Sequence, residues 1–217
     1  MDTGRLSDLL QPFLQNPLAP EQLNCISIYI DLLSRWNRRI NLTAVREPEA
    51  MVTRHFGESL FAAQQLFAMT GTHSAAIPPS VVDVGSGAGF PGVPIKLWAS
   101  GIRLTLIESN QKKAAFLREV TRTLRLNDVD VFSRRAEDFQ SDTADLVTLR
   151  AVEKFESVLP IAARLVAPGG RLALLVGEAQ VKKAQHALAS FAWDTPLTIP
   201  ESLSRVLAIG TLANPSL

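Results

Sequence analysis

The segment 81–92 (VVDVGSGAGFPG) constrains the fold more than any other part of the chain, because it joins an apolar strand to a helix through three alternating glycines. Glycine has no Cβ, so such a turn lets the backbone approach a ligand closely. Pro91 and Pro94 fit the first turn of a helix, where their missing N–H groups have no intrahelical partner, so we expect the helix to begin near Phe90. The N–H groups at that end would face whatever lies on the turn.

Three nucleotide-binding patterns use glycine-rich turns of this kind, and spacing separates them. In the dinucleotide pattern G-x-G-x-x-G/A, counting from Gly85 places Phe90 at the third glycine, where its ring would prevent close packing of helix on strand. A P-loop needs a Gly-Lys-Ser/Thr sequence, which does not follow. The G-x-G-x-G turn of S-adenosylmethionine enzymes, preceded by an acidic residue, fits with Asp83 before the glycines. A purely structural turn is the alternative.

After residue 80 the chain alternates between short apolar strands and helical patterns. Such alternation predicts a doubly wound, Rossmann-like α/β fold with right-handed connections and a mostly parallel sheet, here of seven strands. We expect strands at 81–84, 104–107, 129–132, 146–149, 172–176, 193–199 and 204–211, and helices at 90–99, 111–126, 153–166 and 178–190.

The first 76 residues carry apolar side chains at helical spacing, such as Leu23, Ile26, Ile30 and Leu33, and no strand pattern. The prolines at positions 78 and 79 cannot continue a helix, so we expect a linker near 70–79. The sequence thus predicts a helical N-terminal extension over 1–76 and a Rossmann-like methyltransferase domain over 77–217.

Polar residues follow three of the predicted strands. Glu108 ends the second strand about twenty residues past the glycine turn, where an acid can accept hydrogen bonds from ribose hydroxyls. Ala136 and Glu137 follow the third strand, and Arg150 ends the fourth. Each residue taken singly is equally typical of an exposed surface. Because the carboxyl ends of parallel strands meet at one edge, we expect these residues to lie around one site.

Positive charge is clustered, although 22 Lys and Arg nearly balance 21 Asp and Glu over the whole chain. Residues 35–54 carry five arginines against two glutamates, and residues 112–135 carry seven cations against three acids. Sixteen of the 22 cations are arginine, whose planar guanidinium suits phosphate groups. One such run is typical of a solvated helix face, but two in a nearly neutral chain indicate a polyanionic partner.

The remaining composition disfavours several classes of protein. The single Cys25 cannot form an internal disulfide, and the first twenty residues lack the basic start and apolar run of a signal peptide, so we expect a cytoplasmic protein. No apolar stretch reaches the roughly 18 residues of a membrane helix, so we expect no membrane partner. The three histidines lie far apart without clustered cysteines, so we expect no metal site.

Several further motifs occur in order along the chain. They are Trp36-Asn37, the segment 41–46 (NLTAVR), Arg54-His55-Phe56, Ser59-Leu60, the glycine turn, Lys112-Lys113 and Arg150-Ala151. In this combination the chain resembles the bacterial ribosomal RNA small subunit methyltransferase G family, of the glucose-inhibited division protein B type, over roughly residues 29–180. The resemblance implies an S-adenosyl-L-methionine-dependent 16S rRNA (guanine-N7)-methyltransferase, whose substrate is 16S ribosomal RNA or the small ribosomal subunit.

The resemblance also implies roles for individual residues. It places the cofactor against Gly85, Gly87 and Phe90, the adenosine against Glu108, Ser109 and Asn110, the adenine side against Ala136 and Glu137, and the reacting end near Arg150, which is then both a cofactor-binding and a catalytic residue. Many relatives have Asp at the position of Glu108, which leaves its contact with the ribose open. The segment 41–46 and Arg54-His55 would contact RNA or fold over the cofactor.

Guanine N7 carries an unprotonated lone pair and loses no proton when it is methylated, so this chemistry needs no general base. The fourth strand lacks the Asp/Asn-Pro-Pro-Tyr/Phe motif used on exocyclic amines, which disfavours an adenine substrate. Cys25 lies far upstream, which disfavours a cysteine nucleophile attacking cytosine carbon. Trp36 and His55 could stack a base, although such residues on helical segments are more often core or capping residues.

Two other functions use the same fold. A small-metabolite methyltransferase would use the same turn without needing the arginine runs. A non-catalytic RNA-binding module need not bind S-adenosylmethionine at all. For the rRNA methyltransferase we expect a monomer.

Overall fold

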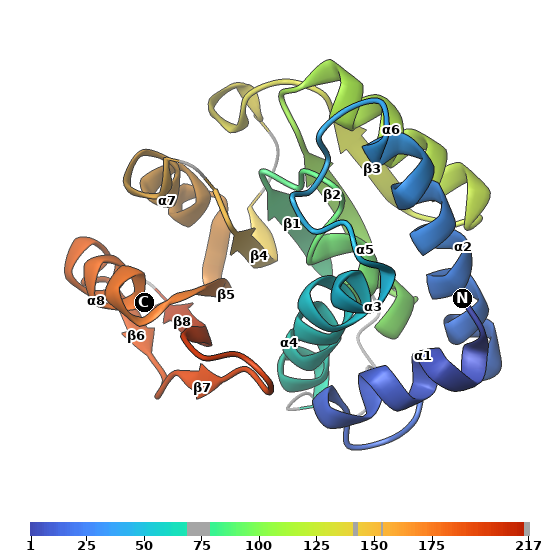
Figure 1. Cartoon of the computed structure of the whole chain (residues 1–217). Helices are drawn as coiled ribbons and strands as arrows, with labels where there is room; N and C mark the ends of the chain where they lie inside the picture. Colours follow the sequence, from blue (N-terminus) through green and yellow to red (C-terminus); the bar gives the residue numbers. More distant parts are fainter. Residues whose placement is uncertain (69–78, 141–142, 153, 215–217) are drawn as a thin grey trace.

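The computed structural model describes residues 1–68, 79–140, 143–152 and 154–214, and it places one sheet between two layers of helices (Figure 1). The strands are β1 (Ser80–Val84), β2 (Arg103–Ile107), β3 (Val129–Phe132), β4 (Ala144–Arg150), β5 (Val166–Gly177), β6 (Phe191–Trp193), β7 (Leu197–Thr198) and β8 (Arg205–Leu212). Their order is β3-β2-β1-β4-β5-β8-β6, with β7 paired to β8. Strands β1 to β5 pair in parallel, whereas β8 is antiparallel to its neighbours. The doubly wound, mostly parallel sheet is confirmed, with seven strands on its main path and the short β7 as an eighth.

The described part of the predicted N-terminal extension is helical, as expected. The helices of the chain are α1 (Thr3–Leu10), α2 (Pro20–Asn37), α3 (Pro48–Met51), α4 (Glu58–Ala68), α5 (Gly92–Trp98), α6 (Gln111–Thr123), α7 (Phe155–Arg164) and α8 (Glu178–Ala187). A π-helical turn over Val52–Gly57 joins α3 to α4, and short 3-10 turns cover Gln11–Phe13 and Ala136–Asp138. The predicted linker, apart from its last residue, and the predicted domain boundary fall on 69–78, outside the described residues.

Some boundaries differ from the sequence expectation for local reasons. Helix α5 begins at Gly92 rather than near Phe90, with Pro91 at its N-cap position. Helix α6 ends three residues early, because Arg125 adopts a left-handed conformation with φ of 51°. The strand expected at 193–199 is divided into β6 and β7, with Pro196, which has no N–H for a ladder, between them.

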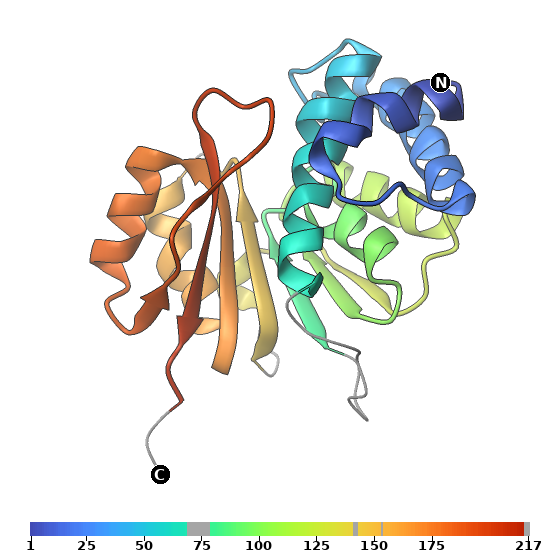
Figure 2. The same ribbon diagram turned by 90° about the horizontal axis from the view of Figure 1, so that it is seen from below.

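Alternate residues of the strands supply the two halves of the core, as the period of two requires. Val81, Leu104, Leu106 and Leu146 pack with α1, α2, α4, α5 and α6, whereas Val82, Val84, Ile107, Val147 and Leu149 pack with α7 and α8. Figure 2 shows these two helical layers on opposite faces of the sheet. Both faces are therefore covered, as expected for buried, uninterrupted apolar strands.

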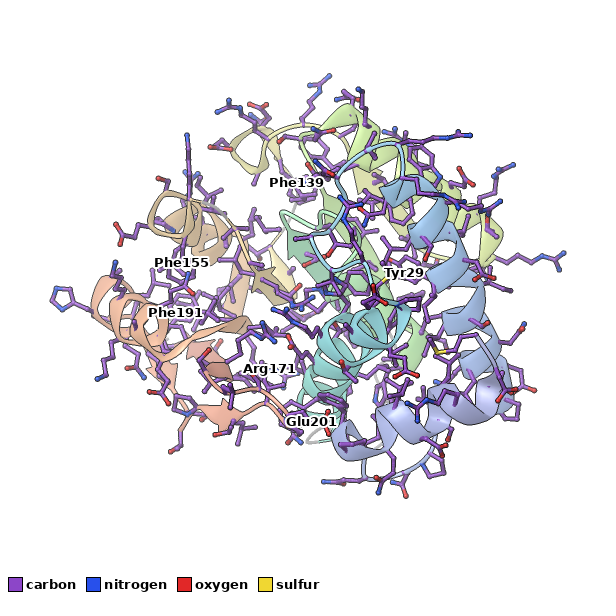
Figure 3. The ribbon with its side chains drawn as sticks, viewed as in Figure 1. Tyr29, Phe139, Phe155, Arg171, Phe191 and Glu201 are labelled. Atoms are coloured by element: carbon purple, nitrogen blue, oxygen red, sulfur yellow. The ribbon has the colours of Figure 1, made fainter. Side chains whose placement is uncertain are left out.

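The N-terminal helices share one continuous core with the sheet and hold the glycine turn directly. Tyr29 of α2 is fully buried between these layers (Figure 3), and its hydroxyl donates to the Ala88 carbonyl at 2.5 Å. Its ring stacks on Phe90 with centroids 5.5 Å apart. A Cβ at Gly89 would lie 2.3 Å from the Tyr29 hydroxyl oxygen, so this position admits only glycine. Residues far apart in sequence thus fix the shape of the turn.

Candidate functional site

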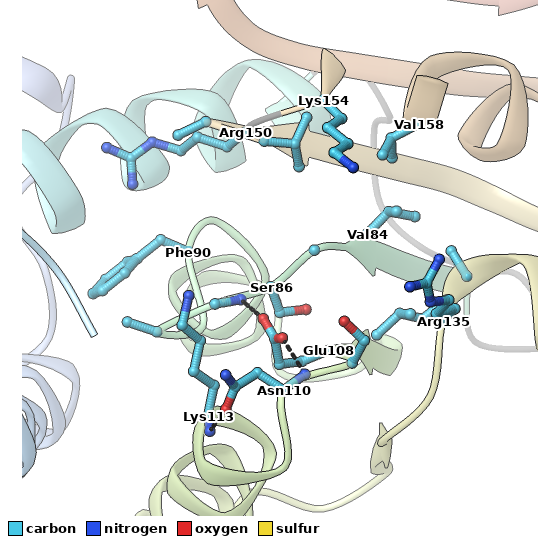
Figure 4. Close-up of a pocket in the computed structure, with 18 of the residues that line it drawn as sticks. Val84, Ser86, Phe90, Glu108, Asn110, Lys113, Arg135, Arg150, Lys154 and Val158 are labelled. Atoms are coloured by element: carbon cyan, nitrogen blue, oxygen red, sulfur yellow. Dashed lines mark hydrogen bonds between the residues drawn. The ribbon is translucent and has the colours of Figure 1, made fainter. Parts of the chain in front are cut away.

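A cavity of about 900 Å³ lies beyond the carboxyl ends of β1, β2 and β4. Strand β1 has β2 on one side and β4 on the other, so the strand order reverses there, and doubly wound sheets bind ligands at such a switch point. Figure 4 shows Arg150 and Lys154 on one side of the cavity and Glu108, Asn110 and Lys113 on the other. The cavity is therefore placed where the sequence predicted a site.

All nine residues that the sequence assigns to the site line this one cavity. They come from the glycine turn after β1, the end of β2, the turn after β3 and the end of β4. Their roles in binding and catalysis stay predictions. The nine residues are Gly85, Gly87, Phe90, Glu108, Ser109, Asn110, Ala136, Glu137 and Arg150.

The first two glycines of the turn are needed for different reasons. Gly85 and Gly87 have φ of 70° and 57°, a region that side chains with a Cβ rarely adopt. A Cβ at Gly85 would also meet the Val152 side chain at 2.8 Å. A Cβ at Gly87 would meet nothing closer than the Gly85 carbonyl oxygen at 3.8 Å. The protein therefore leaves space above Gly87 that its own packing does not use.

Glu108 joins the glycine turn to the start of α6. One carboxylate oxygen accepts the Gly87 N–H at 2.9 Å, and the other accepts the Asn110 N–H at 2.7 Å. The residue is 7% exposed and lines the cavity. A carboxylate has about four acceptor sites, so two remain for donors of a ligand such as ribose hydroxyls. Asn110 in turn caps α6 by accepting the N–H groups of Lys112 and Lys113.

Asp83, the acid that precedes the turn, is a buried brace and not one of the residues that line the cavity. Its carboxylate accepts the Thr148 hydroxyl at 2.8 Å and the Gly92 N–H at 3.3 Å. These bonds tie β1 to β4 and to the first residue of α5. Burial raises the pKa of Asp83 to about 6, although the same hydrogen bonds oppose that shift. Asp83 thus holds the glycine turn from the side that faces away from the cavity.

Arg150 is held by the N-terminal part of the chain. Its Nη2 donates to the Glu58 carboxylate at 3.0 Å and to the carbonyl of Arg54. The guanidinium also lies over the Phe90 ring, 6.0 Å from its centroid, a cation–π arrangement. Burial lowers the pKa of Arg150, and the Glu58 carboxylate opposes that effect. Glu58 therefore supplies the negative charge that a buried arginine needs.

His55 closes the same end of the cavity as a neutral side chain. Arg150 Nη2 lies 3.4 Å from His55 Nδ1, and His55 Nε2 lies 2.7 Å from the Thr43 hydroxyl oxygen. Its ring stacks on Phe90 with centroids 4.9 Å apart. Burial, with Arg150 and Arg54 nearby, lowers the pKa of His55 from 6.5 to about 3. Protonation would set a cation against the Arg150 guanidinium.

Part of this wall cannot be predicted from the sequence. The segment 41–46 and His55 are compatible in sequence with either RNA contact or cofactor cover; in the structure Leu42, Thr43, Ala44 and His55 line the cavity. Glu58 is not among the predicted residues, because one acid on an amphipathic helix carries no signal of a partner 92 residues away. Lys154 and Val158 of the α7 side were missed for the same reason.

The fold and the glycine turn at the switch point define a Rossmann-like methyltransferase. The chain is similar to magnesium protoporphyrin IX methyltransferase from Synechocystis PCC 6803 with bound SAM, with a TM-score of 0.63 at 14% identity over 92% of this chain and 100% of that one. It is also similar to cofactor-bound Rv0187 from MTB, with a TM-score of 0.62 at 16% identity over 88% and 91% of the two chains. At these identities the likeness establishes the fold.

Sequence comparison identifies the family. The family model for rRNA small subunit methyltransferase G matches residues 22–204. A protein of that name from Stenotrophomonas maltophilia (strain K279a) is 37% identical over 192 residues, covering 86% of this chain and 83% of the relative. Its counterpart from Xanthomonas oryzae pv. oryzae (strain MAFF 311018) is 41% identical over 150 residues, covering 69% and 66%. The chain belongs to the rRNA small subunit methyltransferase G family of S-adenosylmethionine-dependent enzymes, which confirms the resemblance.

The residues of the cavity fit S-adenosylmethionine. The space above Gly87 accommodates a ligand against bare backbone, and Glu108 has acceptor sites to spare for ribose hydroxyls. Arg150 lines the cavity, where its N–H groups can donate to an anionic group of the cofactor. Gly85, Gly87, Glu108 and Arg150 would therefore hold the cofactor.

The helices of the described residues are each too short or too polar to span a membrane. Among the same residues, no three or more His, Cys, Asp or Glu side chains gather in a group that could hold a metal ion.

We expect His55→Gln to change how stability depends on pH, because glutamine keeps an acceptor and a donor but does not titrate. The pKa of His55 is lowered in the folded chain. Below pH 6.5 His55 therefore takes up a proton in the unfolded chain but stays neutral in the folded chain. Wild-type stability relative to the variant should fall as pH drops from 6.5 toward 3, by at most about 1.4 kcal/mol per pH unit. Denaturant unfolding at several pH values measures this difference; a difference that does not vary with pH would contradict it.

Gly87→Val should abolish binding of S-adenosylhomocysteine while the fold is retained. The added side chain enters space that the protein leaves open, so the cost to folding is backbone strain of about 1–2 kcal/mol. Gly169→Val is the control, since Gly169 has φ of 74° and lies at the opposite end of the sheet; a Cβ there would also meet the Asn214 side chain at 2.8 Å, so the control carries at least the same folding cost. Isothermal calorimetry and thermal unfolding give both quantities. Unchanged affinity in the Gly87 variant would mean that the cofactor lies elsewhere.

Proposed function

We propose that this protein transfers the methyl group of S-adenosylmethionine to N7 of a guanine in 16S ribosomal RNA. The observation that carries the proposal is the family match over residues 22–204, which includes both walls of the cavity. The guanine and its N7 atom are what the family resemblance implies, and the chemistry of the site is compatible with them.

The proton acceptors at the Arg150 end of the cavity are already engaged, which suits a substrate that loses no proton. Both ring nitrogens of His55 already face polar neighbours, the Thr43 hydroxyl at 2.7 Å from Nε2 and Arg150 Nη2 at 3.4 Å from Nδ1. The low pKa of His55 also makes it a poor base. Methylation of an exocyclic amine requires that a proton leave, whereas methylation of guanine N7 does not. The site therefore favours a ring nitrogen with a free lone pair.

Arg150 serves the reaction by orientation and charge. Bound S-adenosylmethionine supplies an electrophilic methyl group on a positively charged sulfur, and the protein supplies alignment. A guanidinium next to that sulfur would be repelled, so Arg150 suits the carboxylate of the methionyl part. Phe90 and His55 pack around this end and exclude water.

The exposed cations of the two basic sequence runs supply a surface suited to RNA phosphates, which extends from the cavity along α6. We call it the basic rim: Arg35, Arg38, Arg39, Arg46, Arg54, Lys112, Arg118, Arg122, Arg125, Arg134 and Arg135. The two sequence runs that supply it lie together, because Trp36 at the end of α2 donates its indole N–H to Glu119 of α6 at 3.0 Å. Arg134 and Arg135 also line the cavity. Phosphate contacts here would bring an exposed guanine to the reacting end.

The same reasoning supports a monomer in the cytoplasm. Residues of one chain build the cavity from the N-terminal helices to α7, so no second copy is needed to complete it. The small ribosomal subunit, the substrate we propose, is a cytoplasmic particle.

Incubation with unmethylated 16S rRNA, free or in small subunits, should produce one 7-methylguanosine. Mass spectrometry of nuclease fragments locates the modified nucleotide. Methyl incorporation into small-molecule acceptors, measured in parallel, tests the alternative function of a small-metabolite methyltransferase. Methylation of an acceptor other than guanine N7 would overturn the proposal.

RNA binding should weaken steeply with salt, and the double variant Arg38→Gln/Arg39→Gln should reduce that dependence. If each arginine contacts one phosphate, the slope of log affinity against log salt should become shallower by about 1.5. Arg164→Gln, an exposed arginine of α7 outside the basic rim, should leave the slope unchanged. Filter binding between low and moderate salt measures it. A flat response in the wild type would remove the role given to the basic rim.

A further inference from the structure

Arg150 uses only one of its three guanidinium nitrogens on the protein. Nη2 donates to the Arg54 carbonyl and the Glu58 carboxylate, and it lies 3.4 Å from His55 Nδ1. Within the described part of the chain, Nε and Nη1 of Arg150 have no hydrogen-bond partner. Neither atom is among the fully buried unpaired atoms, so both keep some exposure. Since Arg150 lines the cavity and its side chain is only 10% exposed, these N–H groups are available mainly to a ligand.

Glu58 is shared between two arginines that approach it from different parts of the sheet. Its side chain is 2% exposed, with Oε2 bound to Arg150 of β4 and Oε1 bound to Arg205 of β8. Arg205 lies one residue beyond the segment matched by the family model. Its Nε is buried without a partner, so Glu58 is its anchor among the described residues.

This sharing determines what Arg150 can do. A carboxylate with both oxygens free binds an arginine through two parallel hydrogen bonds and satisfies both of the nitrogens involved. In the structure Arg205 occupies Oε1, and Glu58 binds Arg150 through the other oxygen alone. The three side chains also carry two positive charges against one negative charge, so the cluster keeps a net attraction for an anion. Arg150 is the member of the cluster that lines the cavity.

We propose that Glu58 and Arg205 are positioning residues that hold Arg150 by Nη2 and keep its other N–H groups directed at the cofactor carboxylate. This inference rests on the proposed function of Arg150. Without Arg205, Glu58 is free to form a two-bond pair with Arg150, which neutralises it and turns it from the cavity. Arg205 thus acts through Arg150 and touches no ligand itself.

A double-mutant cycle tests this, with S-adenosylhomocysteine affinity measured by calorimetry. Arg205→Met should weaken binding about tenfold, the scale of one hydrogen bond to a charged group. In an Arg150→Met background the same change should alter affinity less than twofold, because the residue it acts through is gone. Equal losses in both backgrounds, or no loss in the wild-type background, would overturn the proposal.

Further variants separate positioning from general damage. Arg205→Lys retains a cation for Oε1 and should recover affinity to within about threefold of wild type, whereas loss equal to that of Arg205→Met would count against the proposal. Arg171→Met removes a half-buried arginine at the other end of the β5–β8 pair and should leave affinity unchanged. If Arg205→Met fails to fold, Arg205→Gln serves in the same cycle. A wild-type protein that binds no S-adenosylhomocysteine would refute the proposed function itself, whereas tight binding with additive variants would refute only the positioning role.

Discussion

The glycine turn between β1 and α5 is held through its backbone, and the site is built around it. The Gly87 N–H binds Glu108, the Ala88 carbonyl accepts from Tyr29, and the Gly92 N–H binds Asp83. Each partner comes from a different element, so the turn keeps one shape only when the whole layer is assembled. Because the turn is already held in one shape, it loses little conformational entropy when a ligand binds. The site is therefore preorganised.

The N-terminal helices are part of the site as well as of the core. The N-terminal part of the chain contributes Tyr29 and Phe56, which pack on Phe90 of the turn, and His55 and Thr43 at the cavity wall. The predicted division into an extension and a Rossmann-like domain follows the point where the sequence changes from helical spacing alone to alternating strand and helix patterns. In the folded molecule these helices and the sheet share one continuous set of buried side chains.

Sequence patterns predicted most of the sheet, because a buried strand and a turn leave local signals. The bounds of β3 are those expected, and the nine predicted site residues meet because parallel strands end at one edge. What could not be predicted depends on partners distant in sequence. Glu58 is an ordinary helix acid until Arg150 and Arg205 are placed against it, and Asp83 lies beneath the turn because strand alternation points it away from the cavity.

The link from Glu58 to Arg205 spans 147 residues and joins the first helical layer to the last strand. A chain emerging from the ribosome therefore cannot form this contact until residue 205 has been synthesised and β8 has entered the sheet between β5 and β6. Tyr29, Asp83 and Glu108, which hold the glycine turn, all precede Arg205 in the chain. They are therefore synthesised before the residue that completes the contacts of Glu58. The order of synthesis thus delays the complete site until Arg205 and the rest of β8 have been made.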